Sequence, residues 1–530
     1  MPPLRSHCPW LPLPGLLLLL PLALAGQGAG TWRIYQGRSE LGRETFRQVG
    51  DTLDQVTVVG VINFRGVSRS VLGPDGRLRQ YRLTVTNAAG DSVRGSLEAA
   101  VDGDSVRVVR TRGTEQTVTV HAGRPLLALP PQSTFTFAEL ATRLGGQDTT
   151  ALLFVAGGDT LLPVSVRSLG DSVRLGLASL VVTVRLEGGI AREIDIPAQG
   201  ARAVLAGPTE PLPPLAGLKP PAPDYAPPAG AAWTATEVRV PAGTAPDTFS
   251  LGCTFTRPAG APPFPAAITI TGSGIQTRDE SLWPLLRDYR IFGQVAERLT
   301  AAGIATLRCD DRSAGASGGR PDSATTADLA EDTRAQIRWL RQQPGIAPDR
   351  IALVGHSEGA IIAPLLGAQD RRLAALVLMA GPSKNGTDIL VDQATWPIRT
   401  QPGLTDSARA IRIREVAAAV RADSMPALPW MRWFRHYDPL RAARQVRQPV
   451  LILQGALDRQ VTAGQADTLA AVIREAGNKK VTEQIFPGLN HLFLHSPTDG
   501  SPAEYASLTE VEVPAAVLDT LTDWLVRTLR

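Results

Sequence analysis

The sequence predicts a two-part protein, with an all-β N-terminal domain followed by an α/β domain built on a mostly parallel sheet. Short runs of alternating apolar and polar residues, separated by Gly-Asp turns, fill residues 31–206. Apolar runs typical of buried parallel strands alternate with helix patterns in residues 232–530. A proline-rich stretch at residues 207–231 separates the two patterns and is typical of a stiff linker.

Length and composition agree with a globular protein of two or three domains. The chain has 530 residues, of which 43% are hydrophobic and 20% charged, and its net charge is only +4. Its basic residues are almost all Arg and are scattered, so no tract indicates nucleic-acid binding. We therefore expect no nucleic-acid partner.

Residues 1–25 are typical of a signal peptide. Arg5 supplies the positive charge, Leu16 to Leu24 form the apolar core, and Ala23-Leu24-Ala25 offers a cleavage site between small residues. The apolar run is short for a membrane span, so we expect no stable span after cleavage. The sequence thus predicts an exported protein, periplasmic or secreted, and an uncleaved signal anchor is the alternative.

Residues 31–206 are predicted to form an antiparallel meander, sandwich or open barrel. The pentapeptide Gly-Asp-Ser-Val-Arg occurs three times, at 90–94, 103–107 and 170–174. A nucleophile is needed only once, so we interpret the repeat as turn chemistry rather than a hydrolase signature. This half predicts no activity, and binding of a polymer or a partner protein is the alternative role.

Strand and helix signals alternate after the proline-rich stretch. The predicted strands are 267–270, 305–307, 351–354, 375–379, 450–453 and 481–485. The predicted helices are 286–301, 326–342, 360–366, 409–421 and 465–476. Between about 383 and 440 the pattern changes to a segment rich in Trp, Met, Leu and Pro, which predicts a cap over the sheet.

A G-x-S-x-G motif at residues 355–359 joins a predicted strand to a predicted helix. This context is typical of a nucleophile elbow, in which a sharp turn exposes the Ser357 hydroxyl. A chain of this composition contains about 0.2 such motifs by chance, so the prediction depends on partner residues.

A serine nucleophile needs a base and an orienting acid. His491, in the loop after the last predicted strand, is the predicted base, with His495 as the alternative. Asp458 follows the strand 450–453, at the edge of the sheet where catalytic groups collect, and is the predicted acid. The rival Asp438 precedes a proline and is explained by turn formation.

The negative charge that develops on a carbonyl oxygen during attack needs N–H donors. The backbone N–H of Glu358, directly after the nucleophile, is one predicted donor. The second is the backbone N–H of Ser273, in a Gly-Ser-Gly loop that follows the strand 267–270. A phosphate-binding loop is the weaker alternative, because no Lys-Ser/Thr follows.

Residues from about 233 to 530 resemble the bacterial α/β-hydrolases of the esterase and serine-aminopeptidase-like group. The resemblance implies an α/β-hydrolase fold, with helices on both faces of a mostly parallel sheet and a helical cap. Ser313 departs from the pattern, which has Gly there. The matching segments are 272–274, Arg278-Asp279-Glu280, 310–317, 355–359, 433–439, Asp458 and His491.

The family fold also implies a disulfide. It would place Cys253 and Cys309 on neighbouring antiparallel strands, where an oxidising compartment would allow them to bond. Two buried free thiols are the alternative.

The resemblance and the residues together predict an exported serine hydrolase that acts on small-molecule carboxylic esters, without a metal or organic cofactor. A peptidase or amidase is one alternative, with Glu358, or Asp279 and Glu280, binding a free amino group. An acyltransferase or thioesterase is another, and the oligomeric state is not predicted. The predicted pocket walls in the cap, which ordinary cap packing would explain equally well, are Trp430, Met431, Trp433 and Phe434.

Overall fold

The computed structural model describes most of the chain on both sides of the proline-rich stretch. The predicted signal peptide at 1–25, and residues 208–222 of the predicted linker, lie outside the described residues. The described ranges are 28–36, 39–60, 64–87, 90, 92–157, 160–177, 180–197, 200–207, 223–283, 285–286, 288–320, 324–401, 403–422 and 429–530.

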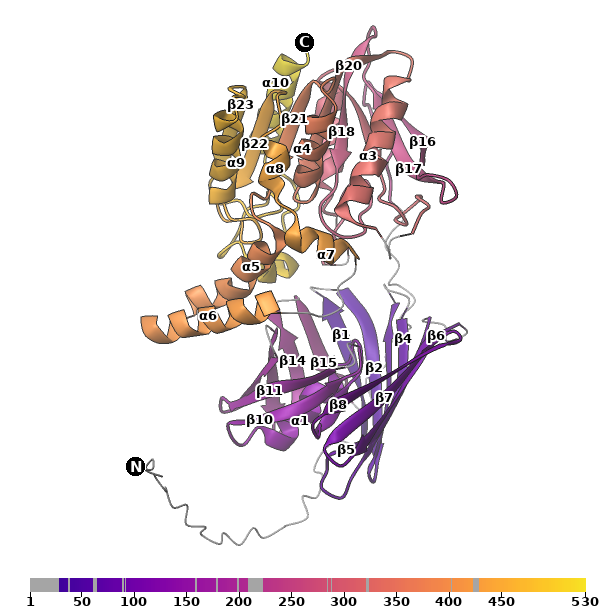
Figure 1. Ribbon diagram of the computed structural model, residues 1–530, viewed down its shortest axis with the longest axis vertical. Helices are drawn as coiled ribbons and strands as arrows, with labels where there is room; N and C mark the ends of the chain where they lie inside the picture. Colours follow the sequence, from indigo (N-terminus) through magenta and orange to yellow (C-terminus); the bar gives the residue numbers. More distant parts are fainter. Residues whose placement is uncertain are drawn as a thin grey trace, which may run out of the picture.

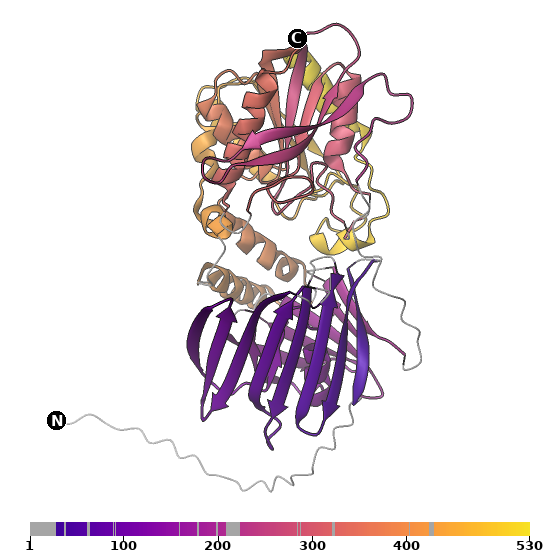
Figure 2. The same ribbon diagram turned by 90° about the vertical axis from the view of Figure 1, so that its right-hand side faces the viewer.

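The N-terminal half is one curled sheet of 15 strands in the described residues. Consecutive strands pair antiparallel, except that the pair β9–β10 is parallel and that β8 and β9 are the two edge strands. An antiparallel β1–β15 pairing joins the first strand to the last. Figures 1 and 2 show this sheet below the second domain. The strands are β1 (Ala29–Gln36), β2 (Ser39–Val49), β3 (Thr52–Val59), β4 (Phe64–Leu72), β5 (Leu78–Thr86), β6 (Val93–Asp102), β7 (Ser105–Arg112), β8 (Glu115–Ala122), β9 (Leu127–Leu129), β10 (Thr149–Val155), β11 (Thr160–Ser168), β12 (Ser172–Leu177), β13 (Leu180–Glu187), β14 (Ile190–Ile196) and β15 (Ala201–Leu205).

The turn interpretation of the repeated pentapeptide is confirmed at two of its three copies. Residues 103–107 join β6 to β7, and residues 170–174 join β11 to β12. Gly103 and Gly170 adopt φ values of 55° and 77°, a left-handed conformation that glycine adopts without strain.

The prediction that this half is β throughout is wrong at one place. Helix α1 (Phe135–Leu144) lies against the sheet and buries Phe135, Leu140 and Ala141 in the core. Its N-terminal N–H groups are satisfied by Glu44 of β2, whose Oε2 accepts from the backbone of Thr134 at 2.7 Å and of Phe135 at 2.8 Å. Because the capping carboxylate belongs to a residue 90 positions earlier in the chain, the sequence next to the helix contains no signal for its start.

The second domain contains an eight-stranded sheet in the order β16-β17-β19-β18-β20-β21-β22-β23. The pairs β16–β17 and β17–β19 are antiparallel and the remaining neighbours are parallel, as the resemblance implies. The strands are β16 (Thr234–Ala242), β17 (Phe249–Arg257), β18 (Phe264–Ile270), β19 (Ala305–Cys309), β20 (Ile346–His356), β21 (Ala375–Met379), β22 (Val450–Gly455) and β23 (Val481–Phe486).

Helices cover both faces of this sheet. α3 (Thr326–Arg341), α4 (Gly359–Gln369) and α9 (Gly464–Glu475) contribute to one apolar cluster, while α2 (Ile291–Ala301) and α10 (Ala515–Thr528) contribute to the other. Helix α2 begins five residues later than predicted, because Leu286 instead forms an isolated bridge with Leu282.

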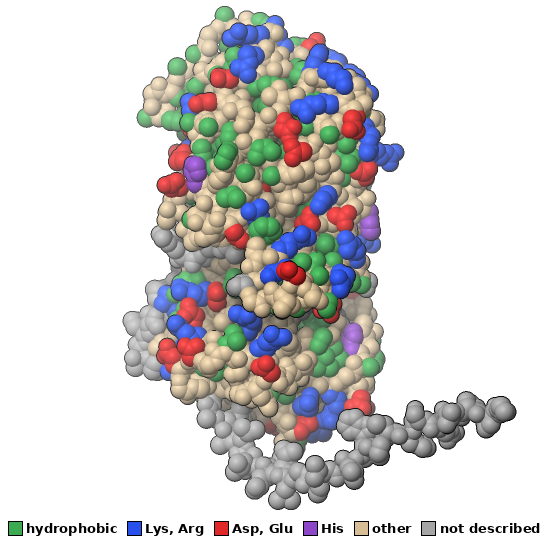
Figure 3. All heavy atoms as spheres, turned by 90° about the vertical axis from the view of Figure 1, so that its left-hand side faces the viewer, with side chains coloured by type: hydrophobic (Ala, Val, Ile, Leu, Met, Phe, Trp, Pro, Cys, Tyr) green, Lys and Arg blue, Asp and Glu red, His purple; other side chains and the backbone are tan. Residues whose placement is uncertain are grey.

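The cap consists of α5 (Gly386–Thr400), α6 (Asp406–Ala422), α7 (Pro429–His436) and α8 (Pro439–Ala443). Figures 1 and 2 both show α5 and α6 between the main body of this domain and the N-terminal sheet. On the face seen in Figure 3, side chains of both charges are interspersed, without an extended patch of one sign. In the described ranges, every helix is too short or too polar to cross a membrane.

Cys253 and Cys309 are directly opposite each other in the antiparallel β17–β19 pair, and the structure joins them by a disulfide. One of its two cysteines, Cys309, is the last residue of β19 and directly precedes Asp310 and Asp311.

Candidate active site

Ser357 occupies the sharp turn between β20 and α4. Its φ of 53° is unusual for a residue with a side chain, and such strain is typical of a nucleophile elbow. The flanking glycines allow the turn, because a β-carbon on Gly355 would overlap the carbonyl of Gly359, and one on Gly359 would overlap that of Ile270. The serine side chain is half-buried at the end of the strand.

Asp458 and His491 meet in the same region, on the loops after β22 and β23. Asp458 Oδ2 lies 2.7 Å from His491 Nδ1, and the aspartate side chain is 0% exposed. The carboxylate also accepts from the backbone N–H groups of Gln460 and Val461, each at 2.8 Å, and from Gln454 Nε2 at 2.8 Å. These contacts hold the carboxylate toward the imidazole.

Neither rival candidate takes part in the contact between Asp458 and His491. Asp438 accepts a hydrogen bond from the backbone of Leu440 and caps α8, as its turn sequence suggested. His495 is exposed, at the far end of the loop that carries His491. In the described chain no hydrogen bond joins the Ser357 hydroxyl to the imidazole of His491, and such bonds often form only when substrate is bound.

His356 reaches this site although sequence reasoning gave it no task. Its Nδ1 lies 2.6 Å from Glu280 Oε1, and its Nε2 lies 2.9 Å from the backbone carbonyl of His491. The rings of His356 and His491 are 4.9 Å apart. Burial lowers the pKa of His356, but the charge of Glu280, its hydrogen bond, the His491 carbonyl and the charge of Asp458 outweigh it and raise that pKa.

The loop that carries Ser273 follows β18 and approaches the serine. A β-carbon built on Gly272 would lie 3.3 Å from the Ser357 β-carbon. Asp311 holds this loop at two points, because its carboxylate accepts from Thr271 Oγ1 at 2.9 Å and from the backbone N–H of Gln276 at 2.9 Å. Within the described residues, no acceptor is bonded to the backbone N–H of Ser273 or of Glu358.

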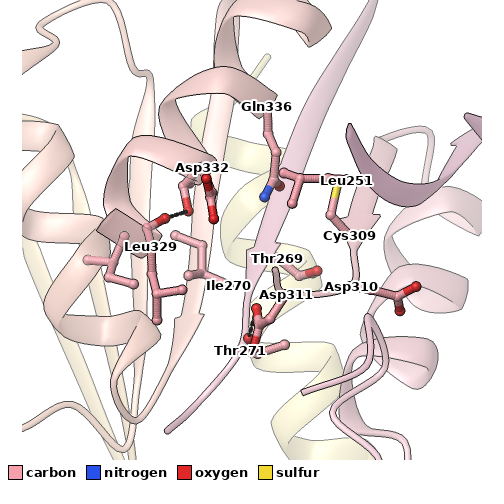
Figure 4. A pocket seen from close by; sticks show the side chains of 12 residues that line it. Leu251, Thr269, Ile270, Thr271, Cys309, Asp310, Asp311, Leu329, Asp332 and Gln336 are labelled. Atoms are coloured by element: carbon pink, nitrogen blue, oxygen red, sulfur yellow. Dashed lines mark hydrogen bonds between the residues drawn. The ribbon is translucent and has the colours of Figure 1, made fainter. Parts of the chain in front are cut away.

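A small cavity lies behind this loop, and the carboxylate of Asp311 is on its wall (Figure 4). Burial raises the pKa of Asp311 to about 8, despite the lowering effect of its two hydrogen bonds. The neighbouring Asp310 accepts three hydrogen bonds from Arg278, whose side chain is almost fully buried. Ser313, which replaces the family's glycine, keeps a left-handed φ of 64°.

One of the predicted pocket residues, Trp430, contacts the elbow. Trp430 Nε1 donates to Glu358 Oε1 at 2.7 Å, and its ring stacks on Phe434 at 5.1 Å. Trp433 stacks on Tyr437 instead, at 4.1 Å, and Met431 is half-buried on the same helix. Burial raises the pKa of Glu358, against hydrogen bonds from Thr326, Trp430 and Ser273 that lower it.

No group of three or more His, Cys, Asp or Glu side chains in the described ranges is arranged to hold a metal ion. A mostly parallel sheet with one antiparallel edge, a strained serine between strand and helix, and an aspartate and a histidine after the last two strands define the architecture of the α/β-hydrolases.

Known proteins agree with this class. A family model described as serine aminopeptidase, S33, matches residues 286–498. The chain is 25% identical to esterase EstD of Thermotoga maritima over 309 residues, which cover 56% of this chain and 72% of the relative. It is 28% identical to a monoacylglycerol lipase of Mycolicibacterium smegmatis over 252 residues, 44% of this chain and 82% of the lipase.

Among solved structures, esterase Pf2001 of Pyrococcus furiosus matches with a TM-score of 0.38 and 17% identity, covering 56% of this chain and 92% of the esterase. The C-terminal half of the chain has the α/β-hydrolase fold and is similar to the esterase and serine-aminopeptidase-like group. The protein is thus a serine hydrolase of the α/β fold.

Proposed function

We propose that this protein is an exported serine hydrolase that cleaves carboxylic esters through an acyl-enzyme on Ser357. The observation that carries the proposal is the 2.7 Å contact between Asp458 and His491 beside the strained serine turn. The relatives named as an esterase and a monoacylglycerol lipase support an ester substrate.

In the proposed reaction, Ser357 Oγ attacks the ester carbonyl carbon and its proton passes to His491 Nε2. Asp458 holds the imidazole in the required tautomer. The backbone N–H groups of Ser273 and Glu358 bind the oxyanion, and their lack of other acceptors in the described residues supports this role. The alcohol leaves with the proton from His491, and water then releases the carboxylic acid with His491 as base.

The environment of three carboxylates favours ester hydrolysis over aminopeptidase activity. A free amino group of a peptide would need an acidic anchor, for which the sequence offers Glu358, Asp279 and Glu280. All three are buried, and each is already bonded to a neighbour: Glu358 to Trp430, Asp279 to Arg308, and Glu280 to His356. In this structure each of these carboxylates lies out of solvent, whereas an anchor for a free amino group has to face the bound substrate.

Two observations support export. The N-terminal segment has the charge, apolar core and small residues of a signal peptide. The Cys253–Cys309 disulfide is of a kind that persists in oxidising compartments. Intact masses of the exported protein, with and without reduction and alkylation, test both points, because they report the mature N-terminus and the number of free thiols.

The mechanism is tested with a panel of acyl esters and aminoacyl anilides on the wild type and on Ser357→Ala. We expect ester cleavage, a loss of at least about 10⁴-fold in kcat in the variant, and labelling of Ser357 by a fluorophosphonate. Full activity of Ser357→Ala, or labelling of another residue, would show that the mechanism is wrong. Faster cleavage of anilides than of esters would favour the peptidase alternative.

A further inference from the structure

Three segments of the candidate site meet at Glu280 and His356. Glu280 Oε1 contacts His356 Nδ1, in the turn that carries Ser357, and His356 Nε2 contacts the carbonyl of His491. A β-carbon on Gly272, in the loop of Ser273, would lie 2.8 Å from Glu280 Oε1. Glu280 is 4% exposed and His356 1%, so both lie out of solvent.

The geometry places one hydrogen of His356 on Nε2 and restricts the other to the contact between Nδ1 and Glu280. A backbone carbonyl only accepts, so Nε2 of His356 carries a hydrogen and donates it to His491. Nδ1 faces the carboxylate of Glu280 at a distance typical of a charge-assisted hydrogen bond. His356 donates both hydrogen bonds at once only when its imidazole carries two hydrogens. The raised pKa of His356 agrees with this state.

The other hydrogen bonds of this loop hold the neighbours of His491 on both sides, and Leu489 and Asn490 are bonded through their backbone. Tyr289 Oη donates to the carbonyl of Leu492 at 3.1 Å, and Asn490 Oδ1 accepts from the backbone of Leu492 at 3.0 Å and of Leu494 at 3.2 Å. In the described chain, His356 is the donor that reaches the carbonyl of His491 itself.

We propose that Glu280 and His356 form a positioning pair for the serine-hydrolase site, in which the doubly protonated imidazole holds the backbone of His491 against the Ser357 turn. The proposal rests on the proposed function, because it assigns His491 the role of base. Glu280 and His356 take no part in bond making; they act through His491.

The pair gives the enzyme a defined response to alkaline pH. The groups that face His356 are Glu280 from the loop after β18, Asp458 and His491 from the loops after β22 and β23, and Tyr289 beside Glu280. When His356 loses a proton, one hydrogen remains for two acceptors. If it stays with Glu280, the carbonyl of His491 loses its donor, and kcat falls while KM is unchanged.

Two variants of Glu280 separate positioning from simple loss of structure. Glu280→Ala removes the partner, and we expect kcat to fall about 10- to 100-fold with KM within about twofold of wild type. Glu280→Gln can donate its amide to Nδ1 of a neutral His356, which then keeps Nε2–H on the His491 carbonyl. We expect Glu280→Gln to restore kcat to within about fivefold of wild type. We also expect it to remove the alkaline limb, which is the fall of kcat at high pH caused by deprotonation of His356.

A matched control is His495→Asn, in the same loop but exposed, for which kcat and the pH profile should equal wild type. All rates are divided by the concentration of active sites that react with a fluorophosphonate, so that unfolded protein is not counted. If Ser357 is labelled in wild type but Glu280→Ala retains the full kcat and alkaline limb, the positioning pair is refuted and the proposed function stands. If Ser357 is not labelled in wild type, the proposed function itself fails.

A second readout does not depend on turnover. The chain has 6 histidines, so ¹⁵N-histidine labelling of Ser357→Ala gives a simple spectrum, in which His356→Asn identifies the His356 signals. We expect both ring nitrogens of His356 to carry hydrogen at pH 7, and one to lose it in Glu280→Ala. A His356 ring with hydrogen on Nδ1 alone at pH 7 would overturn the proposal.

Discussion

Replacing Trp430 with Phe removes one hydrogen bond between the cap and the turn that carries Ser357, while an aromatic ring remains. In the wild type, Trp430 Nε1 donates to Glu358 Oε1 at 2.7 Å, and its ring stacks on Phe434 with an interplanar angle of 8°. A Phe ring can keep the stacking but offers no donor. Glu358 keeps the hydrogen bond from Thr326 Oγ1 at 2.6 Å. The change therefore isolates the link between α7 and the turn that carries Ser357.

The expected cost follows from the nature of this bond. A hydrogen bond contributes about 0.5–1.5 kcal/mol when both partners are neutral and about 1.5–3 kcal/mol when one is charged. Burial raises the pKa of Glu358 and disfavours its charged form, so we take about 1.4 kcal/mol, which corresponds to a factor of about ten. Because the bond positions the cap and not the reacting atoms, the loss should appear mainly in KM.

The assay is kcat/KM for a series of acyl esters of increasing chain length. For Trp430→Phe we expect about a tenfold decrease for chains long enough to contact α7, and little change for acetyl esters, with kcat close to wild type. Trp396→Phe is the matched control, because it removes an indole hydrogen bond to a carboxylate, Asp499 Oδ2 at 3.0 Å, from α5 in the same cap. Equal effects of the two variants at every chain length, or no effect of Trp430→Phe, would refute the reasoning.

Three further predictions concern stability. Native Asp311 has a pKa of about 8, against about 3.9 when unfolded, so the native state binds more protons and the free energy of unfolding falls as pH rises from about 4 to 8. Asp311→Asn should remove this decline, so its Tm relative to wild type should rise from pH 5 to pH 8; a constant difference would contradict it. Reducing Cys253–Cys309, which closes a loop of 56 residues, should lower the free energy of unfolding by about 4 kcal/mol, and guanidinium melts with and without reductant check this value. Glu44→Ala leaves the N-terminus of α1 without acceptors and should cost about 3 kcal/mol in denaturant melts; a cost below about 1 kcal/mol would show that water replaces the carboxylate.

The strands of the second domain could be predicted because both faces of a parallel sheet are buried. The run 375–379 is apolar throughout and Gly381-Pro382 follows it, and its predicted ends coincide with those of β21. The run 351–354 gave only the buried end of β20, which begins at Ile346, because the exposed residues 348–350 interrupt the apolar pattern. Helix α1 was missed because the carboxylate that caps it, from Glu44, lies about 90 positions away in the chain.

Some residues of the candidate site could be predicted from the sequence and others could not. Ser357, Asp458 and His491 each follow a predicted strand, and each belongs to a residue type with few rivals in the right place, so their sequence positions carried the signal. Glu280 and His356 are 76 positions apart in the chain. The second partner of His356 is a backbone carbonyl, which every residue has, so the sequence cannot single it out. The resemblance marked Glu280 as part of a motif, but only the three-dimensional structure identifies His356 as its partner.

Buried carboxylates surround the candidate site, and each holds a different part of it. Asp311 holds the loop of Ser273, Glu280 acts through His356 on the backbone of His491, and Glu358 holds the cap through Trp430. Each of these carboxylates would be costly to bury alone, and the hydrogen bonds that compensate the cost also define the position of a loop. The polar network therefore holds the loops around Ser357, and one of its members, Glu358, also contacts the aromatic cap. Substitutions in the network should alter kcat and its pH dependence, whereas substitutions in the cap should alter KM and the preferred acyl chain.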